Sequence, residues 1–149
     1  MAACSGPGYA GHMASLARSI DRRELGVPLI GIVDADRRVR HSLTDLLRLG
    51  GVRVAGAVGS SREALEMVEL HGPDVLVIDP RLPTVEAGAA LLSRIRTTWP
   101  GIHVVLIGWR DGLEGEAGIE PAIYVSKNAA PVEFLRAILD ALRTAPPTS

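Results

Sequence analysis

Short apolar runs alternate with segments of helical periodicity along most of this chain, and this alternation limits its fold more than any other feature. Five runs, rich in Val, Ile and Leu, are too short to be helices. They occupy residues 29–33, 52–55, 74–78, 102–107 and 123–125. Short buried runs of this kind are typical of strands in a parallel sheet that helices cover on both sides.

Four segments between and after these runs carry apolar residues at helical spacing. They lie around residues 39–47, 64–70, 90–95 and 132–142. Ser60 followed by Glu63 forms a capping box at the start of the second segment. Gly72-Pro73 ends that segment, and Pro131 is suited to the first turn of the last one.

Strand–helix repeats of this kind join parallel strands through right-handed crossovers. The sequence therefore predicts an α/β fold with three layers, in which helices cover both faces of a doubly wound five-stranded parallel sheet. One repeat is abnormal, because several Gly residues and Pro121 interrupt the stretch from residue 109 to residue 122. We expect a shortened fourth helix there.

The domain predicted from this pattern spans residues 28–143. We expect a flexible N-terminal extension over residues 1–27 and a disordered tail over residues 144–149. The sequence does not decide whether translation starts at Met1 or Met13.

Composition narrows the classes of function. A net charge of −1 without a basic block argues against a nucleic-acid surface, so no direct DNA binding is expected. The single cysteine, Cys4, cannot form an internal disulfide, which fits a cytoplasmic location. The four histidines are scattered without the spacing of zinc ligands. No apolar stretch reaches the length of a membrane span, so no membrane association is expected.

Two acidic residues follow strand-like runs, at the edge where folds of this class place their sites. Asp34 comes directly after the run 29–33, and Asp79 directly after the run 74–78. In a doubly wound sheet these two strands are neighbours, so the two carboxylates should meet and repel unless a cation lies between them. Hard oxygen ligands suit Mg²⁺. Asp36 either contributes to this site or caps the following helix.

A basic residue follows the fifth run at the same edge. The ammonium of Lys127 can pair with Asp79 or with a phosphate attached to it. A lysine at a strand end is usually a solvated charge, but two acids at the same edge favour a role in the site.

These residues stand in segments that resemble the response-regulator receiver domain of two-component signalling, a CheY-like family. The similarity covers about residues 28–143 and rests on three segments. They are Ile32-Val-Asp-Ala-Asp36, Asp74-Val-Leu-Val-Ile-Asp-Pro-Arg-Leu-Pro83 and Tyr124-Val-Ser-Lys-Asn128. The resemblance implies a flavodoxin/CheY-like fold and a phosphorelay signalling protein that is not an enzyme.

The resemblance also assigns roles to the matching residues. Asp79 would be the phospho-acceptor, taking the group from a phosphohistidine of a histidine kinase or phosphotransfer protein. Asp34 and the backbone carbonyl of Arg81 would hold Mg²⁺ together with Asp79. Lys127 would bind the phosphoryl group.

Four positions depart from the family pattern. Ala35 replaces a second acid that usually ligates the metal directly, which should weaken Mg²⁺ binding. Gly108 stands where the family carries a Ser or Thr hydroxyl that couples to an aromatic switch residue, here Tyr124. Asn128 replaces a proline after Lys127, so a trans peptide bond is expected. The shortened fourth helix is the last departure.

Two functions stay open within this family. The chain is expected to be either a stand-alone module that accepts phosphate on Asp79 or a phosphorylation-independent pseudo-receiver that only binds proteins. Output would pass through protein contacts, with an unknown downstream partner and a homodimer as one option. A flavodoxin-like enzyme or small-ligand binder is disfavoured, because no Gly-rich phosphate loop follows the first strand.

Other residues near this edge bear on partners. Trp109 is either an exposed contact anchor or packs over the shortened helix. We interpret Arg37, Arg38 and Arg40 as a solvated helix face or as a docking surface for an acidic partner. Arg81 and Arg110 add positive charge at this edge, and these arginines would partly replace the missing hydroxyl by pairing with phosphate.

Overall fold

Strands and helices alternate as the sequence predicts in residues 26–109 and 123–143, the part of the chain that the computed structural model describes. The strands are β1 (Leu29–Val33), β2 (Arg53–Val58), β3 (Val75–Ile78), β4 (His103–Gly108) and β5 (Ile123–Ser126). The helices are α2 (Arg37–Leu49), α3 (Ser61–His71), α4 (Val85–Thr98) and α5 (Pro131–Arg143). The expected N-terminal extension up to residue 25, the expected tail over residues 144–149 and the shortened helix expected between β4 and β5, over residues 110–122, lie outside the described residues.

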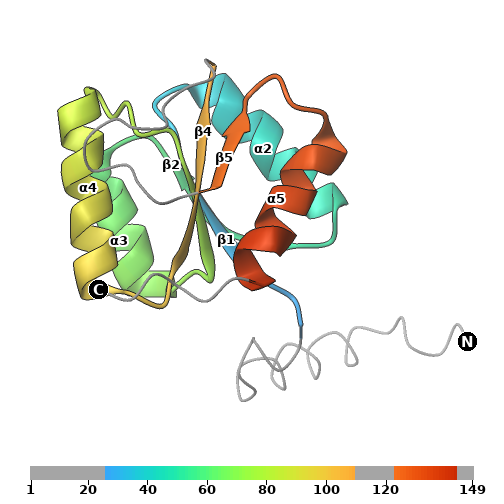
Figure 1. Cartoon of the computed structure of the whole chain (residues 1–149), viewed down its shortest axis with the longest axis horizontal. Coiled ribbons are helices and arrows are strands. Elements are labelled where there is room, and N and C mark those ends of the chain that lie inside the picture. The colour runs from blue at the N-terminus through green and yellow to red at the C-terminus, as the bar shows by residue number, and fades with distance from the viewer. Residues whose placement is uncertain (1–25, 110–122, 144–149) are drawn as a thin grey trace, which may run out of the picture.

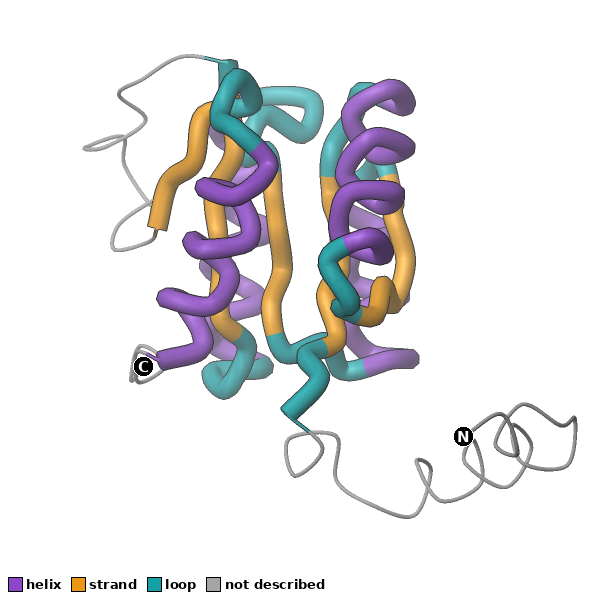
Figure 2. The backbone as a smooth tube through the Cα atoms, turned by 90° about the vertical axis from the view of Figure 1, so that its right-hand side faces the viewer, coloured by secondary structure: helices purple, strands orange, loops and turns teal. Residues whose placement is uncertain are grey.

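All five strands form one parallel sheet in the order β2-β1-β3-β4-β5. Helices α3 and α4 cover one face of this sheet, and α2 and α5 cover the other (Figure 1). Figure 2, which is viewed from the side of α2 and α5, shows both helices lying in front of the strands. The predicted three-layer α/β architecture is therefore confirmed, and β1 and β3 are neighbours at its centre.

The core divides into two apolar clusters, one on each face of the sheet. Strand β3 supplies both, because side chains alternate along a strand. Val75 and Val77 belong to the cluster under α2 and α5, whereas Leu76 and Ile78 belong to the cluster under α3 and α4. All four are fully buried. The position of the residue that follows, Asp79, is thus fixed by packing on both faces.

The residues that were predicted to begin or end helices lie at the ends of the observed helices. The hydroxyl of Ser60 accepts the Glu63 N–H at 3.2 Å, which is the first bond of the predicted capping box, and donates to the Glu63 carboxylate at 2.9 Å. Gly72 ends α3 in the left-handed conformation, at φ +55°. Pro131 is the first residue of α5. No helix in the two described ranges is long and apolar enough to cross a membrane.

Strand β2 is longer than the run 52–55 predicts, since it continues to Val58. Gly56 and Ala57 lack the branched side chains that mark a strand in sequence, yet their backbones pair with β1. At Gly56 a Cβ would lie 3.0 Å from the sulfur of Met67. The small residue therefore leaves room for α3 to pack closely on this edge strand.

Helix α4 packs directly on the loop that follows Asp79. A Cβ at the buried Gly88 would lie 1.5 Å from the carbonyl oxygen of Pro80. Neither atom can move without displacing backbone, so Gly88 sets how closely α4 approaches the loop.

Replacement of Gly88 by Ala should therefore lower the free energy of unfolding by about 2 kcal/mol, because overpacking against backbone forces a shift of the helix. Helix propensity alone predicts the opposite sign, a gain of about 1 kcal/mol. Urea unfolding measures the difference. The control is Ala90→Gly at an exposed position of the same helix, which should lose about 1 kcal/mol. A stabilised Gly88→Ala variant would contradict the packing argument.

Candidate functional site

Three charged residues extend the strands β1, β3 and β5 at the carboxyl edge of the sheet. Each is still held by a backbone hydrogen bond to a neighbouring strand. The amides of Asp34, Asp79 and Lys127 donate to the carbonyls of Val58, Val33 and Gly108 at 3.0, 2.9 and 2.8 Å. The sheet therefore fixes the backbone from which each of these side chains projects.

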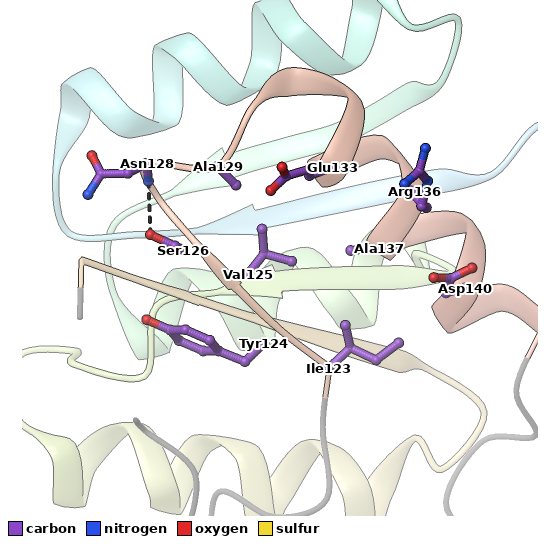
Figure 3. A pocket seen from close by; sticks show the side chains of 10 residues that line it. All are labelled: Ile123, Tyr124, Val125, Ser126, Asn128, Ala129, Glu133, Arg136, Ala137 and Asp140. Atoms are coloured by element: carbon purple, nitrogen blue, oxygen red, sulfur yellow. Dashed lines mark hydrogen bonds between the residues drawn. The ribbon is translucent and has the colours of Figure 1, made fainter. Parts of the chain in front are cut away.

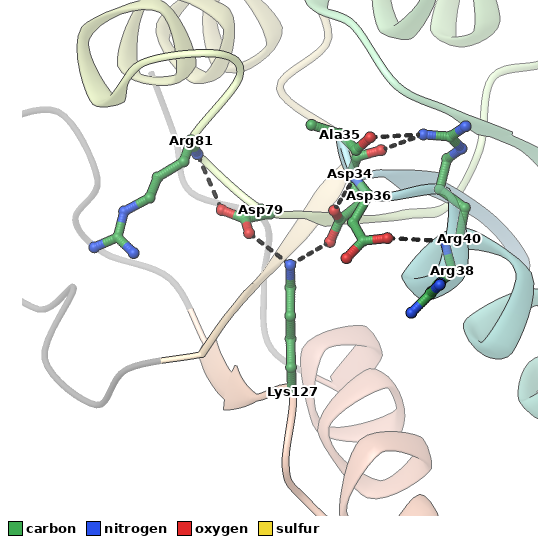
Figure 4. A network of polar contacts seen from close by, with 8 residues as sticks. All are labelled: Asp34, Ala35, Asp36, Arg38, Arg40, Asp79, Arg81 and Lys127. Atoms are coloured by element: carbon green, nitrogen blue, oxygen red, sulfur yellow. Dashed lines mark hydrogen bonds and ion pairs between the residues drawn. The ribbon is translucent and has the colours of Figure 1, made fainter.

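The side chains of these three residues meet in one buried cluster (Figure 4). The ammonium nitrogen of Lys127 lies 2.6 Å from Oδ2 of Asp34 and 2.7 Å from Oδ2 of Asp79. The side chains of Lys127, Asp34 and Asp79 are 4%, 2% and 12% exposed. The sequence prediction that two acids and a lysine share this edge is correct in geometry.

The second oxygen of each carboxylate accepts a backbone N–H from the loop that follows it. Oδ1 of Asp34 accepts the amide of Asp36 at 2.8 Å, and Oδ1 of Asp79 accepts the amide of Arg81 at 3.0 Å. Oδ2 of Asp34 is buried and has no well-directed hydrogen bond, so its close contact with Lys127 is a pairing of charges. This oxygen can accept a further donor or a cation.

Lys127 is the only lysine in the 149-residue chain. Burial opposes the charge on its ammonium, but the close contacts with the Asp34 and Asp79 carboxylates and their charge attraction outweigh burial and raise the pKa of Lys127. The residue is therefore a cation at neutral pH, as a partner for two carboxylates must be.

Trp109 lies directly beside this cluster. Its ring centroid is 5.4 Å from the Lys127 nitrogen, and 54% of the residue is exposed. The ring also lines a cavity of about 450 Å³ between α2 and α5, with apolar walls from Val39, Leu43 and Phe134. Trp109 is thus exposed, as a contact anchor would be. Its role as a contact anchor stays a prediction.

A second cavity of about 400 Å³ lies between β5 and α5 (Figure 3). Tyr124, half-buried on β5, lines it together with the charged side chains of Glu133, Arg136 and Asp140 from α5. In the sheet, Tyr124 pairs with Leu106, whereas Gly108 pairs with Ser126. The switch roles of Gly108 and Tyr124 stay predictions.

Asp36 caps α2, which is one of the two roles that the sequence allows. Its carboxylate accepts the Arg38 amide at 2.9 Å and is exposed. A role for Asp36 in metal binding stays a prediction. The peptide bond between Lys127 and Asn128 is trans, as expected, since the only cis bond in the described ranges is Leu82–Pro83.

The donor set at this edge suits a weakly held Mg²⁺. Two carboxylates and the carbonyl of Arg81 are hard oxygen ligands, and Mg²⁺ in proteins commonly uses one or two carboxylates with several waters. Oδ2 of Asp34 and Oδ2 of Asp79 both contact the Lys127 ammonium, so an ion at this edge would share these two carboxylates with Lys127. The side chain of Ala35 adds no ligand. In residues 26–109 and 123–143, no group of three or more His, Cys, Asp or Glu side chains is arranged so that it could hold a metal ion.

The interpretation of the arginine cluster is wrong for Arg40. Arg37 and Arg38 are exposed, as predicted, but Arg40 is half-buried and its Nη1 donates to the carbonyls of Asp34 and Ala35 at 2.9 and 3.1 Å. A helical side chain leans toward the preceding turn, which brings the guanidinium back over the loop. The Arg81 side chain extends away from the Asp79 carboxylate in Figure 4, and its role toward phosphate stays a prediction.

Comparison with known proteins identifies the family. The sequence model of the response regulator receiver domain matches residues 30–138. The chain belongs to this family. Receiver domains act in two-component signalling and are in general signalling modules rather than enzymes.

Two curated relatives come from mycobacteria. The response regulator MprA of Mycobacterium leprae is 35% identical over 118 residues, covering 77% of this chain and 51% of the relative. The transcriptional regulatory protein PdtaR of Mycobacterium tuberculosis is 30% identical over 66 residues, 42% of this chain and 32% of the relative. The chain spans about half the length of the first relative.

Solved receiver domains share the fold. The signal receiver domain of NarL from Mycobacterium tuberculosis superposes with a TM-score of 0.69 at 25% identity, covering 78% of this chain and 97% of that one. A CheY-like receiver domain from Methanospirillum hungatei gives 0.68 at 23% identity, over 78% and 94% of the two chains. The second likeness concerns the fold alone.

Replacement of Lys127 by Met should lower the free energy of unfolding near neutral pH by about 3 kcal/mol, because two buried carboxylates lose their shared cation. Urea unfolding measures this loss. The matched control is Arg62→Met, which breaks the exposed pair with Glu66 and should cost less than about 0.5 kcal/mol. Equal losses in the two variants would contradict a special role for the buried cluster.

The pH dependence of this stabilisation follows from the raised pKa of Lys127. A folded pKa above the unfolded value of about 10.4 means that the stabilisation is fully present below about pH 10 and is lost as the pH rises through the folded pKa. The stability difference between wild type and Lys127→Met should therefore shrink above that range. Urea unfolding of both proteins across alkaline pH tests this, and a constant difference would contradict it.

Proposed function

We propose that this receiver domain accepts a phosphoryl group on Asp79 from a phosphohistidine of a histidine kinase or phosphotransfer protein. The observation that carries the proposal is the contact of 2.7 Å between the Lys127 ammonium and a carboxylate oxygen of Asp79. A lysine in this position holds a compact positive charge where a phosphoryl group on Asp79 would stand.

The reaction needs positioning and charge neutralisation more than proton transfer. A carboxylate oxygen of Asp79 attacks phosphorus while the bond from phosphorus to the donor histidine nitrogen breaks, and the histidine keeps the electron pair. The product is an acyl phosphate on Asp79. The Arg81 amide, at 3.0 Å from Oδ1, orients the carboxylate, and Lys127 shifts its pairing from Asp79 to a phosphoryl oxygen.

Mg²⁺ belongs to this proposal as a weakly bound cofactor. Held by Asp34, Asp79 and the Arg81 carbonyl, it would neutralise negative charge on the phosphoryl oxygens. With Ala35 in place of a second acid, we expect binding at millimolar concentrations.

The surface beside the cluster supports a protein phosphodonor. The cavity between α2 and α5 adjoins Lys127, and its apolar walls could receive a helix of the donor. Val132 and Leu139 on α5 are 59% and 47% exposed, and they offer a contact area for a downstream protein or a second copy of the chain. The proposal includes a cytoplasmic location, where a lone cysteine stays reduced.

One alternative has support of its own. Ala35 and Gly108 remove a metal ligand and a hydroxyl, which favours a pseudo-receiver that binds proteins without phosphorylation. In that case the Lys127 cluster would serve only to hold the strand ends together.

Incubation with acetyl phosphate and Mg²⁺, followed by intact mass spectrometry, should add the mass of one phosphoryl group to the wild-type protein. The adduct should be absent in Asp79→Asn and retained in Asp45→Asn, an exposed acid on α2. No wild-type adduct at high donor concentration would overturn the proposal and leave the pseudo-receiver function. An adduct that persists in Asp79→Asn would place the reaction on another residue.

A further inference from the structure

The guanidinium of Arg40 closes the loop between β1 and α2. Its Nη1 donates to the carbonyls of Asp34 and Ala35 at 2.9 and 3.1 Å (Figure 4). The Arg40 amide donates to the Asp36 carbonyl at 3.1 Å, which is a helical backbone bond at the start of α2. The side chain of Arg40 therefore binds two consecutive carbonyls of this loop. The same loop carries the Asp34 carboxylate, which accepts the amide of Asp36.

Gly59, on the loop after β2, provides the space in which this guanidinium lies. A Cβ at Gly59 would be 2.7 Å from Nη1 of Arg40 and 3.6 Å from the Asp34 carbonyl oxygen. The backbone of Gly59 is not in the left-handed region, so other residues could adopt its conformation. The absence of a side chain thus makes room for Arg40 rather than for an unusual turn.

We propose that Arg40, seated against Gly59, is a positioning residue that fixes the β1–α2 loop so that the Asp34 carboxylate faces Asp79 and Lys127. The consequence for Mg²⁺ and phosphoryl transfer rests on the function proposed above. Because Ala35 leaves Asp34 without an adjacent acid, the orientation of this one carboxylate decides how well the edge of β1 can bind a cation.

The charge of Arg40 and its hydrogen bonds act in opposite directions on a cation. A guanidinium near the site repels Mg²⁺, so loss of the charge alone would strengthen binding. Loss of the hydrogen bonds frees the loop and weakens binding. The sign of the change in Mg²⁺ affinity therefore separates a positioning role from a simple effect of charge.

Two substitutions reach the same contact from opposite sides. Arg40→Gln removes both the charge and the guanidinium, whereas Gly59→Ala keeps the charge and displaces the tip of Arg40. Arg40→Lys keeps the charge and one donor group. Arg38→Gln is the matched control, since it removes the same charge from an exposed position two residues away on the same helix.

Amide NMR spectra supply two readouts. Without metal, exchange of the Asp36 amide should be about fivefold faster in Arg40→Gln and Gly59→Ala, with amides of β3 unchanged. In Mg²⁺ titrations both variants should bind about fivefold more weakly, which corresponds to the loss of roughly one hydrogen bond. The double variant should be no weaker than Arg40→Gln, Arg40→Lys should recover part of the affinity, and Arg38→Gln should not weaken binding.

Tighter Mg²⁺ binding by Arg40→Gln, or wild-type behaviour of Gly59→Ala in both readouts, would overturn the proposal. If the wild-type protein binds no Mg²⁺, the function proposed above fails in its metal dependence. The exchange of the Asp36 amide then still decides the role of Arg40, because that readout needs no metal, and unchanged exchange would reject it.

Discussion

The contact of one ammonium with two buried carboxylates organises the carboxyl edge of this sheet. Asp34 and Asp79 end neighbouring strands, and burial would make their mutual repulsion costly without the Lys127 cation between them. The three residues come from β1, β3 and β5, which are far apart in sequence. Formation of the sheet brings them together.

Such a cluster is an unusual way to stabilise a fold. Replacement of a buried ion pair by apolar residues is often neutral or stabilising, so buried charges at a strand edge indicate chemistry more than stability. In the described ranges, Asp34 and Asp79 are the only polar or charged residues that are buried as whole residues, and the side chain of Lys127 is buried with them. With one lysine for two acids, the cluster keeps a negative charge that a divalent cation could balance. The chain belongs to the receiver family, and we propose that this arrangement accepts a phosphoryl group on Asp79.

The fold and the central residues of the site could be predicted because they depend on simple patterns. The β-branched run before Asp79 reports burial on both faces, and parallel topology brings the ends of β1 and β3 together. The full length of β2 could not be predicted, because Gly56 and Ala57 have low strand propensity and pair only through their backbones.

The position of the Arg40 side chain could not be predicted from the sequence for a different reason. Its spacing on α2 resembles that of a solvated arginine, and its actual position depends on the missing side chain of Gly59, nineteen residues later. Gly88 is similar, because its contact with Pro80 depends on how closely α4 approaches the loop. Contacts that require the absence of an atom leave no periodic signal. Gly59 lies between β2 and α3 and Gly88 lies within α4, and the presence of glycine at these two positions was the one available indication.

The most direct test of the central contact uses the fact that Lys127 is the only lysine of the chain. Protein labelled with ¹³C at the lysine ε carbon should give one side-chain signal for Lys127. We expect this signal to titrate above the ordinary lysine pKa of about 10.4 in the wild type, and we expect the pKa to fall toward that value in Asp34→Asn and in Asp79→Asn. A wild-type signal that titrates at or below the ordinary value, unchanged in both variants, would contradict it.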